Sequence, residues 1–413
     1  MPSPPAFAVR RLALTAFRSW RSARLETPAR CVVLTGPNGA GKTNLLEALS
    51  LLAPGRGLRR ARMADLQRRG GPATGPEANW PETHWAVSAW LDTPEGLRRV
   101  GTGRDSAGDP ASDPGGESGA VPARRLLRID GVPARGQGEL SNLGAIVWLT
   151  PEMDGLFSGP AGERRRFLDR LVVGFLPRHA TRLAAYEKAM RERNRLLRLP
   201  RTSEGADPAW LDALEAAMAE RGVAVAAARA DFTARLAAAC AGRVSAFPAP
   251  AVALDGGEDP MAAEEPALRA EEALKERLKA SRAADADAGR ALVGPHRADL
   301  VVHFTASGQA GEMPAAACST GEQKALLIAL VLAAARLQAV ERGAAPMLLL
   351  DEVAAHLDRH RRAALFQEIE ELGAQAWMTG TDAGMFDALR GRACFVAVAD
   401  GALQVARMPD GTP

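Results

Sequence analysis

Cysteine is scarce in this sequence, and the few cysteines form no recognisable cluster. The 413 residues include only four, without a C-x-x-C pair or a histidine at ligand spacing: Cys31, Cys240, Cys318 and Cys394. This scarcity argues against a disulfide scaffold or a zinc site and is typical of a reducing cytosol. The N-terminus also lacks a signal-peptide pattern. We therefore expect a cytoplasmic protein.

Long uninterrupted apolar runs are missing as well. The best candidate, residues 325–340, contains Arg336 and Gln338, so we interpret it as a buried helix. The sequence predicts no membrane span, which excludes a transporter that carries its own membrane domain.

Lysine is rare, and the net charge of +3 does not by itself favour nucleic acid as a partner. The charge is unevenly spread, however. Residues 1–70 carry thirteen Lys or Arg against three Asp or Glu, and residues 163–201 carry twelve against four. Residues 254–287 carry ten acids against five bases. Any nucleic-acid binding must therefore depend on local basic patches, for which solvated arginine-rich surfaces are the alternative.

The length predicts two or three packed units. Strand-like segments occur toward both ends of the chain, at residues 7–35, 85–91, 121–130, 145–150, 299–304, 347–352, 376–381 and 394–400. Between these groups, residues 161–245 and 269–283 are helical in character, with breaks near Pro200 and Pro208. Turn-forming residues predict a loop at 101–120 and a linker at 246–268.

This pattern predicts an α/β fold with an inserted, mainly helical arm domain. The arm comprises residues 161–290. The two parts of the surrounding head comprise residues 1–160 and 291–413. The arm is too short for a long coiled coil.

The strongest motif is GPNGAGKT, which fits G-x-x-x-x-G-K-[ST] between a predicted strand and a predicted helix. Its glycines let backbone N–H groups turn toward phosphate oxygens, and the helix N-terminus favours negative charge. Lys42 supplies charge to the β- and γ-phosphates, and Thr43 supplies a hydroxyl ligand for Mg²⁺. We predict an ATP site formed by Gly36, Pro37, Asn38, Gly39, Ala40, Gly41, Lys42 and Thr43.

The matching acidic strand is MLLLDE, residues 347–352, whose carboxylates follow a buried apolar run. Ligands of open α/β sheets bind at this end of the strands. We predict that Asp351 binds Mg²⁺ directly or through water and that Glu352 is the general base for the attacking water. Asp358 is either a further nucleotide contact or a helix cap.

A polar segment, STGEQK at residues 319–324, precedes the long apolar helix. Ser319 and Glu322 could form a capping box. Gly321, however, is a poor choice for helix strength alone. Ser-x-Gly-x-Gln upstream of the acidic strand resembles the signature of ABC-type ATPases, in which it contacts the γ-phosphate bound to a second subunit. The signature therefore predicts a homodimer with two composite sites and nucleotide contacts from Ser319, Gly321 and Gln323.

Several segments together resemble the RecF family of bacterial recombination mediators, which belongs to the ABC/SMC-like ATPases. They are AFRSW (16–20), GPNGAGKTNLLEALSLLAPGRGLRRA (36–61), PEMDGLFSGPAGERRRFLD (151–169), GPHRADL (294–300), STGEQK (319–324) and LLLDEVAAHLD (348–358). The family has Pro-Glu-Asp after the strand predicted here at residues 145–150. This sequence has Pro151, Glu152 and Met153 there, with the aspartate one position later at Asp154. The position of the usual switch histidine reads TGTD (379–382), so γ-phosphate sensing would fall to Thr381 or Asp382.

The resemblance implies a weak ATPase that dimerises on ATP and binds dsDNA and ssDNA–dsDNA junctions. It implies action with RecR and RecO in loading RecA, in support of replication, recombinational repair and SOS induction. The alternative is an ABC-type subunit that regulates or docks a protein partner without binding DNA.

Two arginine clusters are the candidate DNA contacts, because phosphate binding needs only positive charge. The first follows the P-loop helix, where Arg59 or Arg60 could instead reach the nucleotide. A separate pair, His296 and Arg297, is interpreted as a tight turn. The candidate DNA contacts are Arg56, Arg59, Arg60, Arg62, Arg164, Arg165 and Arg166.

Overall fold

The computed structural model describes residues 7–68, 84–104, 125–199, 207–241, 245–256, 266–305, 312–355, 357–399 and 401–407. The chain forms two compact units. The first unit combines Met1–Met153 with Gln338–Pro413, and the second is Asp154–Leu337. The second unit is thus an insertion, with wider bounds than the predicted arm. The assignment of residues 161–290 as a separate arm domain stays a prediction.

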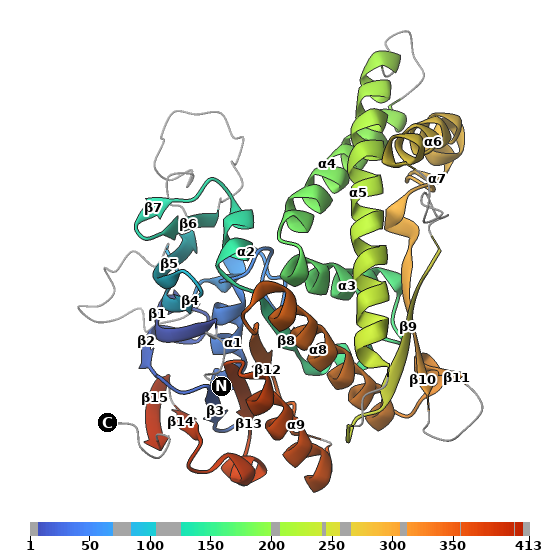
Figure 1. The fold of residues 1–413 in the computed structure, drawn as a ribbon. Helices are drawn as coiled ribbons and strands as arrows, with labels where there is room; N and C mark the ends of the chain where they lie inside the picture. Colours follow the sequence, from blue (N-terminus) through green and yellow to red (C-terminus); the bar gives the residue numbers. More distant parts are fainter. Residues whose placement is uncertain are drawn as a thin grey trace, which may run out of the picture. The chain divides into compact units, whose positions relative to one another are not determined.

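A six-stranded sheet of order β15-β14-β3-β13-β12-β8 organises the first unit (Figure 1). All its neighbouring strands are parallel except β15, which pairs antiparallel with β14. Apolar runs form the parallel strands because both faces of such a sheet are buried. The bounds are β3 Cys31–Thr35, β8 Ile146–Leu149, β12 Met347–Leu350, β13 Ala376–Gly380, β14 Ala393–Ala399 and β15 Ala402–Arg407.

A second sheet of the first unit is antiparallel, with the order β2-β1-β4-β5-β6-β7. Its residues alternate between a buried and a solvent-facing side, as expected for a sheet with one covered face. Residues 101–104 of the predicted loop belong to β5, and residues 105–120 lie outside the described residues. The bounds are β1 Ala8–Phe17, β2 Trp20–Glu26, β4 Ala86–Thr93, β5 Gly96–Arg104, β6 Arg125–Ile129 and β7 Val132–Pro133.

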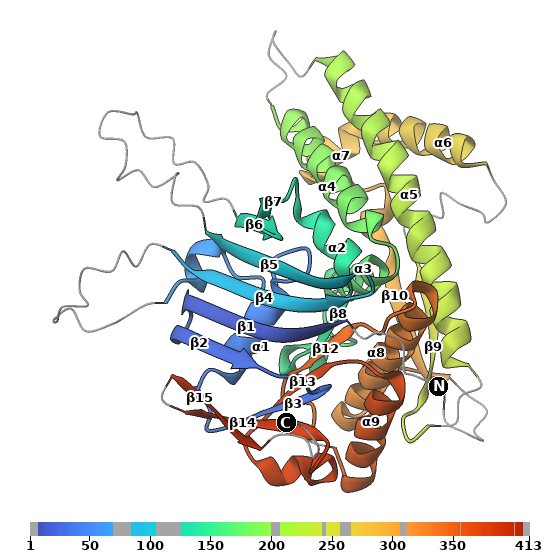
Figure 2. The same ribbon diagram turned by 60° about the vertical axis from the view of Figure 1, so that its left-hand side comes forward.

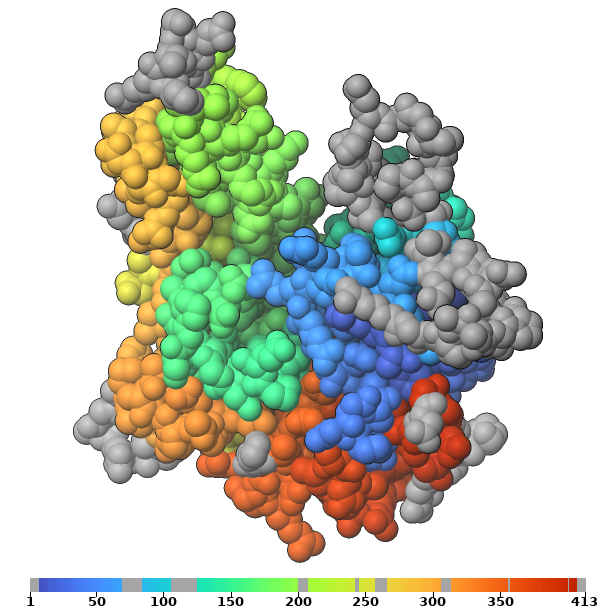
Figure 3. All heavy atoms as spheres, turned by 180° about the vertical axis from the view of Figure 1, so that it is seen from behind, coloured from blue at the N-terminus to red at the C-terminus, as the bar shows by residue number. Residues whose placement is uncertain are grey.

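Helix α1, Lys42–Ser50, packs its apolar side into the core that the two sheets share, through Leu45 and Leu49. Segments from the two ends of the chain, blue and red in Figure 3, lie side by side on one face of this unit. The remaining helical segments are short apart from α9: η1 Met63–Leu66, η3 Gln137–Glu139, α2 Leu140–Leu143, α9 Arg359–Leu372 and η7 Ala383–Leu389. Another, η4 Pro151–Gly155, crosses the boundary between the units.

The second unit is mainly helical. Pro208 begins its longest helix at the first helical position, where the missing N–H costs nothing, and Asp207 caps that helix. The helical segments within this unit are α3 Ala161–Phe175, α4 Arg178–Leu197, α5 Pro208–Cys240, α6 Ala267–Ala280, α7 Arg282–Ala288, η5 Pro295–Arg297 and η6 Ala315–Ala317. Helix α8, Thr320–Arg342, begins in this unit and ends in the first.

The prediction of a linker at 246–268 is wrong for its first part, because β9, Ala249–Asp255, forms there. This strand pairs along its whole length with β10, Asp299–Thr305, which also pairs with β11, Glu312–Pro314. Pairing with a distant strand outweighed the local turn-forming composition. The strand predicted at 299–304 therefore lies in this three-stranded sheet and not in the parallel sheet.

Among the described residues, α8 is the one helix long and apolar enough to cross a membrane. In the structure 72% of its most apolar window is buried, as in the core helix of a globular protein. The interpretation of residues 325–340 as a buried helix is confirmed.

Candidate functional site

The GPNGAGKT segment forms a turn between β3 and α1 whose backbone conformation favours glycine at three positions. Gly36, Gly39 and Gly41 have φ values of 152°, 81° and 104°, a region that residues with a Cβ rarely adopt. A Cβ on Gly36 would lie 2.1 Å from the carbonyl oxygen of Val398. At Gly39, by contrast, no atom lies within 4 Å of such a Cβ, so one side of the loop is open.

Lys42 lies inside this loop. Its Nζ donates hydrogen bonds to the carbonyl oxygens of Gly36 at 2.7 Å and Pro37 at 2.9 Å. Burial lowers the pKa of Lys42, while the charges of Glu352 and Asp351 oppose that shift. The two acidic residues therefore lie close enough to favour the protonated form of Lys42 against the effect of burial.

The strand order brings the acidic edge to the P-loop. β13 lies between β3 and β12, so the carboxyl ends of the three strands are adjacent. The hydroxyl of Thr43 donates to the two carboxylate oxygens of Asp351 at 3.0 and 2.9 Å. These two predicted metal ligands are 308 positions apart in the chain and meet directly in the fold.

Thr379, on β13, is a site residue that the sequence reasoning missed. Its hydroxyl donates to Asp351 Oδ1 at 2.6 Å and accepts from the backbone N–H of Glu352 at 2.8 Å. The side chain is fully buried. Its only signal in the sequence is a polar residue within an apolar strand, two positions before the predicted switch residue Thr381.

Glu352 follows β12 with φ at +49°. A residue with a Cβ in this conformation carries backbone strain of about 1–3 kcal/mol, which commonly occurs at functional positions. The Thr379 hydrogen bond fixes the backbone at this point. Glu352 is thereby held at the carboxyl edge of the sheet, beside Asp351.

The residues present fit a magnesium nucleotide. Thr43 and Asp351 offer hard oxygen ligands, which Mg²⁺ prefers. The loop combines glycine-dependent backbone, a helix N-terminus and a lysine, the donor set that holds phosphate.

A pocket of about 490 Å³ adjoins the P-loop on the side of β1 and β2. Arg18 forms a two-point ion pair with the buried carboxylate of Glu47, at 2.9 and 2.7 Å. Arg59 donates to Asn44 Oδ1 at 2.8 Å. Of the predicted DNA contacts, Arg59 therefore lies beside the P-loop helix and lines this pocket. The full lining is Arg18, Ser19, Asn44, Arg59, Ala61, Asp65 and Gln67.

The signature segment of the second unit is a capping box in the structure. The Ser319 hydroxyl donates to Glu322 Oε2 at 2.7 Å, and the Ser319 backbone N–H donates to the same oxygen at 2.8 Å. Neither backbone conformation nor packing within the described chain requires glycine at position 321. Its φ is not positive, and a Cβ there would meet nothing within 4 Å. Ser319 and Thr320 are exposed at the start of α8, and Gly321 is half-buried.

Two other residues of the segment face inward. The Gln323 side chain is buried and donates to the carbonyl oxygen of Cys318 at 2.9 Å. Lys324 pairs with Asp154 at 3.4 Å. Two acids, Glu152 and Asp154, follow β8. Of these, Asp154 contacts the signature segment.

Two of the three arginines in the second cluster form hydrogen bonds to other residues of the protein. Arg164 forms a two-point pair with Asp299, at 2.9 and 2.6 Å. Arg165 donates to the carbonyl oxygen of Ala298 at 2.7 Å. Only Arg166 remains half exposed, near Glu163 at 3.6 Å. These contacts join the GERRRFLD and GPHRADL segments and favour a structural role for Arg164 and Arg165 over the predicted DNA contact.

The remaining predicted residues are placed as follows. Asp358 caps α9, accepting from the backbone N–H of Arg361 at 2.8 Å, which lowers the pKa of its carboxyl. Thr381 follows β13 and is exposed, and Asp382 caps η7. Arg56, Arg60 and Arg62 are exposed. His296 accepts from or donates to Tyr186 at 2.7 Å in the turn η5, as the tight-turn interpretation requires.

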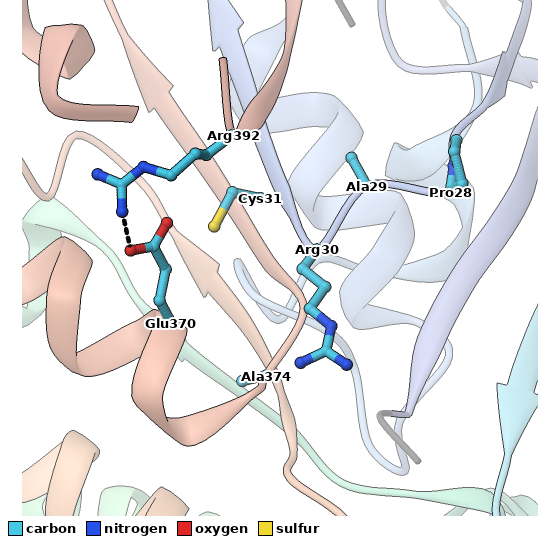
Figure 4. Close-up of a pocket in the computed structure, with 7 residues that line it drawn as sticks. All are labelled: Pro28, Ala29, Arg30, Cys31, Glu370, Ala374 and Arg392. Atoms are coloured by element: carbon cyan, nitrogen blue, oxygen red, sulfur yellow. Dashed lines mark hydrogen bonds and ion pairs between the residues drawn. The ribbon is translucent and has the colours of Figure 1, made fainter. Parts of the chain in front are cut away.

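A second pocket, of about 300 Å³, lies at the opposite, amino-terminal end of the parallel strands, where β3 begins (Figure 4). Glu370 and Arg392 form an ion pair across it, and Arg30 points away from that pair. Burial raises the pKa of the Cys31 thiol to about 12, so this cysteine is inert. Nothing in this pocket resembles the phosphate and metal ligands of the P-loop edge.

The P-loop, the acidic strand beside it and the inserted unit define an ABC-type ATPase head. A family described as "AAA domain, putative AbiEii toxin, Type IV TA system" matches residues 31–77 and 191–381. The fold is similar to a solved structure of "the recombination mediator protein RecF-ATPrS in RecFOR pathway", with a TM-score of 0.79 and 21% identity over 98% of this chain and 100% of that one. An Smc head domain from Pyrococcus furiosus is similar with a TM-score of 0.51 and 17% identity, over 97% and 96% of the two chains.

The sequence narrows this class further. The chain is 47% identical to the DNA replication and repair protein RecF of Mesorhizobium japonicum, over 96% of this chain and 98% of that protein. It is also 47% identical to that of Agrobacterium fabrum, over 95% and 97%. The chain belongs to the RecF family of DNA replication and repair proteins.

Proposed function

We propose that this chain is a weak ATPase that dimerises on ATP, binds gapped DNA and ssDNA–dsDNA junctions, and acts in the cytoplasm. It assists RecA loading together with RecR and RecO, in support of recombinational repair, replication and SOS induction. Membership of the RecF family supports this proposal, as does the fold similarity to "the recombination mediator protein RecF-ATP in RecFOR pathway".

Each residue of the P-loop edge has a role in this proposal. Lys42 and the loop N–H groups would bind the phosphates, and Thr43 with Asp351 would hold Mg²⁺. Mg²⁺, when bound, neutralises phosphate charge and orients the chain of phosphates. Glu352 accepts a proton from the attacking water, and Thr379 positions both acids through its two hydrogen bonds.

The single observation that carries the dimer is the open space at Gly321. A Cβ there would meet no described atom within 4 Å, and the backbone is not in a conformation that favours glycine. This open space supports the proposal that a group from outside the chain approaches the bare backbone. Since each chain has one P-loop and one signature, two copies related by two-fold symmetry complete two composite sites.

Ser319→Arg tests this arrangement, because a bulky cation would fill the space that a phosphate needs. The variant should bind ATP as a monomer, since its P-loop is intact, but should not dimerise. Lys42→Ala should fail to bind ATP. A mixture of the two should regain one working site per dimer, from one variant's P-loop and the other's signature.

Sedimentation with ATP and an ATPase assay of the mixture are the readouts. A normal ATP-dependent dimer of Ser319→Arg would reduce the signature to a helix cap, whose loss costs only about 1 kcal/mol. Ser319→Ala is the comparison variant: it removes the cap and the hydroxyl contact without adding bulk, so it should weaken ATP-dependent dimerisation less than Ser319→Arg does.

A further inference from the structure

The antiparallel sheet of the first unit has a solvent-facing side on which the central side chains are small. Strands β1, β4 and β5 lie side by side there (Figure 2). Their buried residues, such as Leu12, Val87 and Val100, alternate with small outward ones. In two neighbouring rows at the centre the outward residues are uncharged and no larger than threonine, and the half-buried Trp90 lies in the row beside them. These small residues include Ala13, Thr15, Ala86, Ser88 and Gly101.

Arginines stand at the two ends of one row across this face. In the strand register Arg24 faces Ala13, Ala13 faces Ser88, Ser88 faces Gly101, and Gly101 faces Arg128. Four strand spacings separate the two arginines, which places their Cα atoms roughly 19 Å apart. Both side chains are exposed, and neither is bonded to a residue that the structure describes.

A third arginine borders the same face. The guanidinium of Arg99 lies over the ring of Trp90, 5.9 Å from its centroid, in the row next to that of Arg24 and Arg128. The positive charge of Arg99 is not neutralised by this contact, because the ring offers only its quadrupole.

The carboxylates around this face are already paired. Glu26 pairs with Arg11 at 2.9 Å, Asp130 pairs with Arg98 at 2.6 Å, and Asp92 pairs with Arg10. Among the described residues, the charge left on the face is therefore that of Arg24, Arg99 and Arg128. We name these three arginines and the small-residue floor between them the arginine trough.

We propose that the arginine trough binds duplex DNA through its phosphate backbones. This proposal rests on the DNA-binding role proposed above and assigns that role a surface other than the arginines after the P-loop helix. Two positive walls suit the two backbones that border a groove of B-DNA, about 6 or 12 Å wide, because arginine side chains can reach inward from a wider spacing. The small floor lets the double helix approach the sheet closely.

Contacts of this kind carry no sequence information but depend strongly on salt. A single strand has one backbone and could engage only one wall. We therefore expect the trough to favour duplex over single-stranded DNA.

Arg24→Glu with Arg128→Glu tests the charge of the walls. Its matched control reverses two exposed arginines elsewhere, Arg30 and Arg269, so the net charge changes equally. Gly101→Leu tests the floor without changing charge, since a Cβ there meets no atom within 4 Å. Affinity for a fluorescent duplex, a gapped duplex and a single strand is measured with ATP across a salt series.

The wall variant should lose at least about tenfold in duplex affinity, with its salt slope reduced by roughly 2, while the control stays near wild type. Gly101→Leu should weaken duplex binding more than single-strand binding. Unchanged ATP binding in all variants confirms folding. Wild-type protein that binds no duplex overturns the DNA-binding role itself. Wild-type binding with an equal loss in wall and control variants, or a loss confined to single strands, overturns only the trough.

Discussion

Thr379 and Asp351 are joined by a hydrogen bond of 2.6 Å that links the neighbouring strands β13 and β12 beside the P-loop. The same threonine oxygen accepts from the backbone N–H of Glu352 at 2.8 Å. One hydroxyl thus fixes the predicted metal ligand and the backbone of the predicted base. Its partners are two residues whose roles follow from sequence, whereas its own role follows only from strand order.

Thr379→Val should lower ATP turnover by about tenfold while leaving ATP affinity nearly unchanged. Valine keeps the volume but can neither donate to Asp351 nor accept from Glu352, so both acids lose their orientation. The lost hydrogen bonds should also lower the free energy of unfolding by about 1–3 kcal/mol.

Thr379→Ser is the control, because it restores the hydroxyl without the methyl group. Steady-state kinetics separates the two cases. A fall in kcat that serine rescues supports positioning, whereas an equal loss of activity in both variants would indicate that only packing matters at this position.

Glu352→Gln should bind ATP normally, hydrolyse it on the order of 10²-fold more slowly, and accumulate as a dimer. The amide keeps the shape of the side chain but cannot accept the proton of the attacking water. Single-turnover hydrolysis and sedimentation measure the two effects.

Glu352→Gly provides a companion test of backbone strain at this residue. Glycine adopts positive φ without a Cβ penalty, so this variant should be as stable as the wild type within about 1 kcal/mol, although inactive. Wild-type turnover in either variant would exclude Glu352 as the base.

Arg164→Ala and Asp299→Ala should lower the free energy of unfolding by similar amounts, about 1 kcal/mol each, with a double variant less destabilised than their sum. The two side chains form one two-point ion pair that is partly exposed, with 17% and 24% of their surface accessible, so solvent screens it.

Duplex binding distinguishes this structural role from a direct DNA contact. If Arg164 contacts DNA, its removal should weaken binding while Asp299→Ala leaves binding unchanged or strengthens it. If the pair is structural, both variants should affect DNA affinity equally. Arg166→Ala, beside the pair but half exposed, is the control for loss of one charge.

Asp169 should make the protein less stable at acid pH. Burial alone would raise the pKa of this carboxyl, but hydrogen bonds from His179 and Arg229 outweigh burial and lower it. A lowered pKa means that the stabilisation is present above the unfolded value of about 4 and is lost as pH falls through the folded value.

Asp169→Asn should therefore cost about 3–5 kcal/mol at pH 7, because it leaves the buried Arg229 charge without its partner. The difference from wild type should shrink near pH 3. Urea unfolding at both pH values measures it. Asp231→Asn, in an exposed ion pair with Arg235, is the control and should cost under about 1 kcal/mol at either pH.

The local structure of the P-loop and of the acidic strand was largely predictable from the sequence, because each is set by residues close together in the chain. Gly36, Lys42 and Thr43 are close in the chain, and the flanking strand and helix are set by adjacent residues. The apolar run before Asp351 likewise predicts a strand that ends at a carboxylate. The capping box at Ser319 also depends only on residues three positions apart.

Tertiary structure decided which distant residues meet. Thr379 reaches Asp351 because β13 lies between β3 and β12, and Arg164 finds Asp299 135 positions away. The strand β9 formed in a predicted linker because β10 supplied its hydrogen-bonding partner. Arg24 and Arg128 share a row only through the register of five strands. Strand order and register come from side-chain packing across the whole core, and no spacing within a segment encodes them.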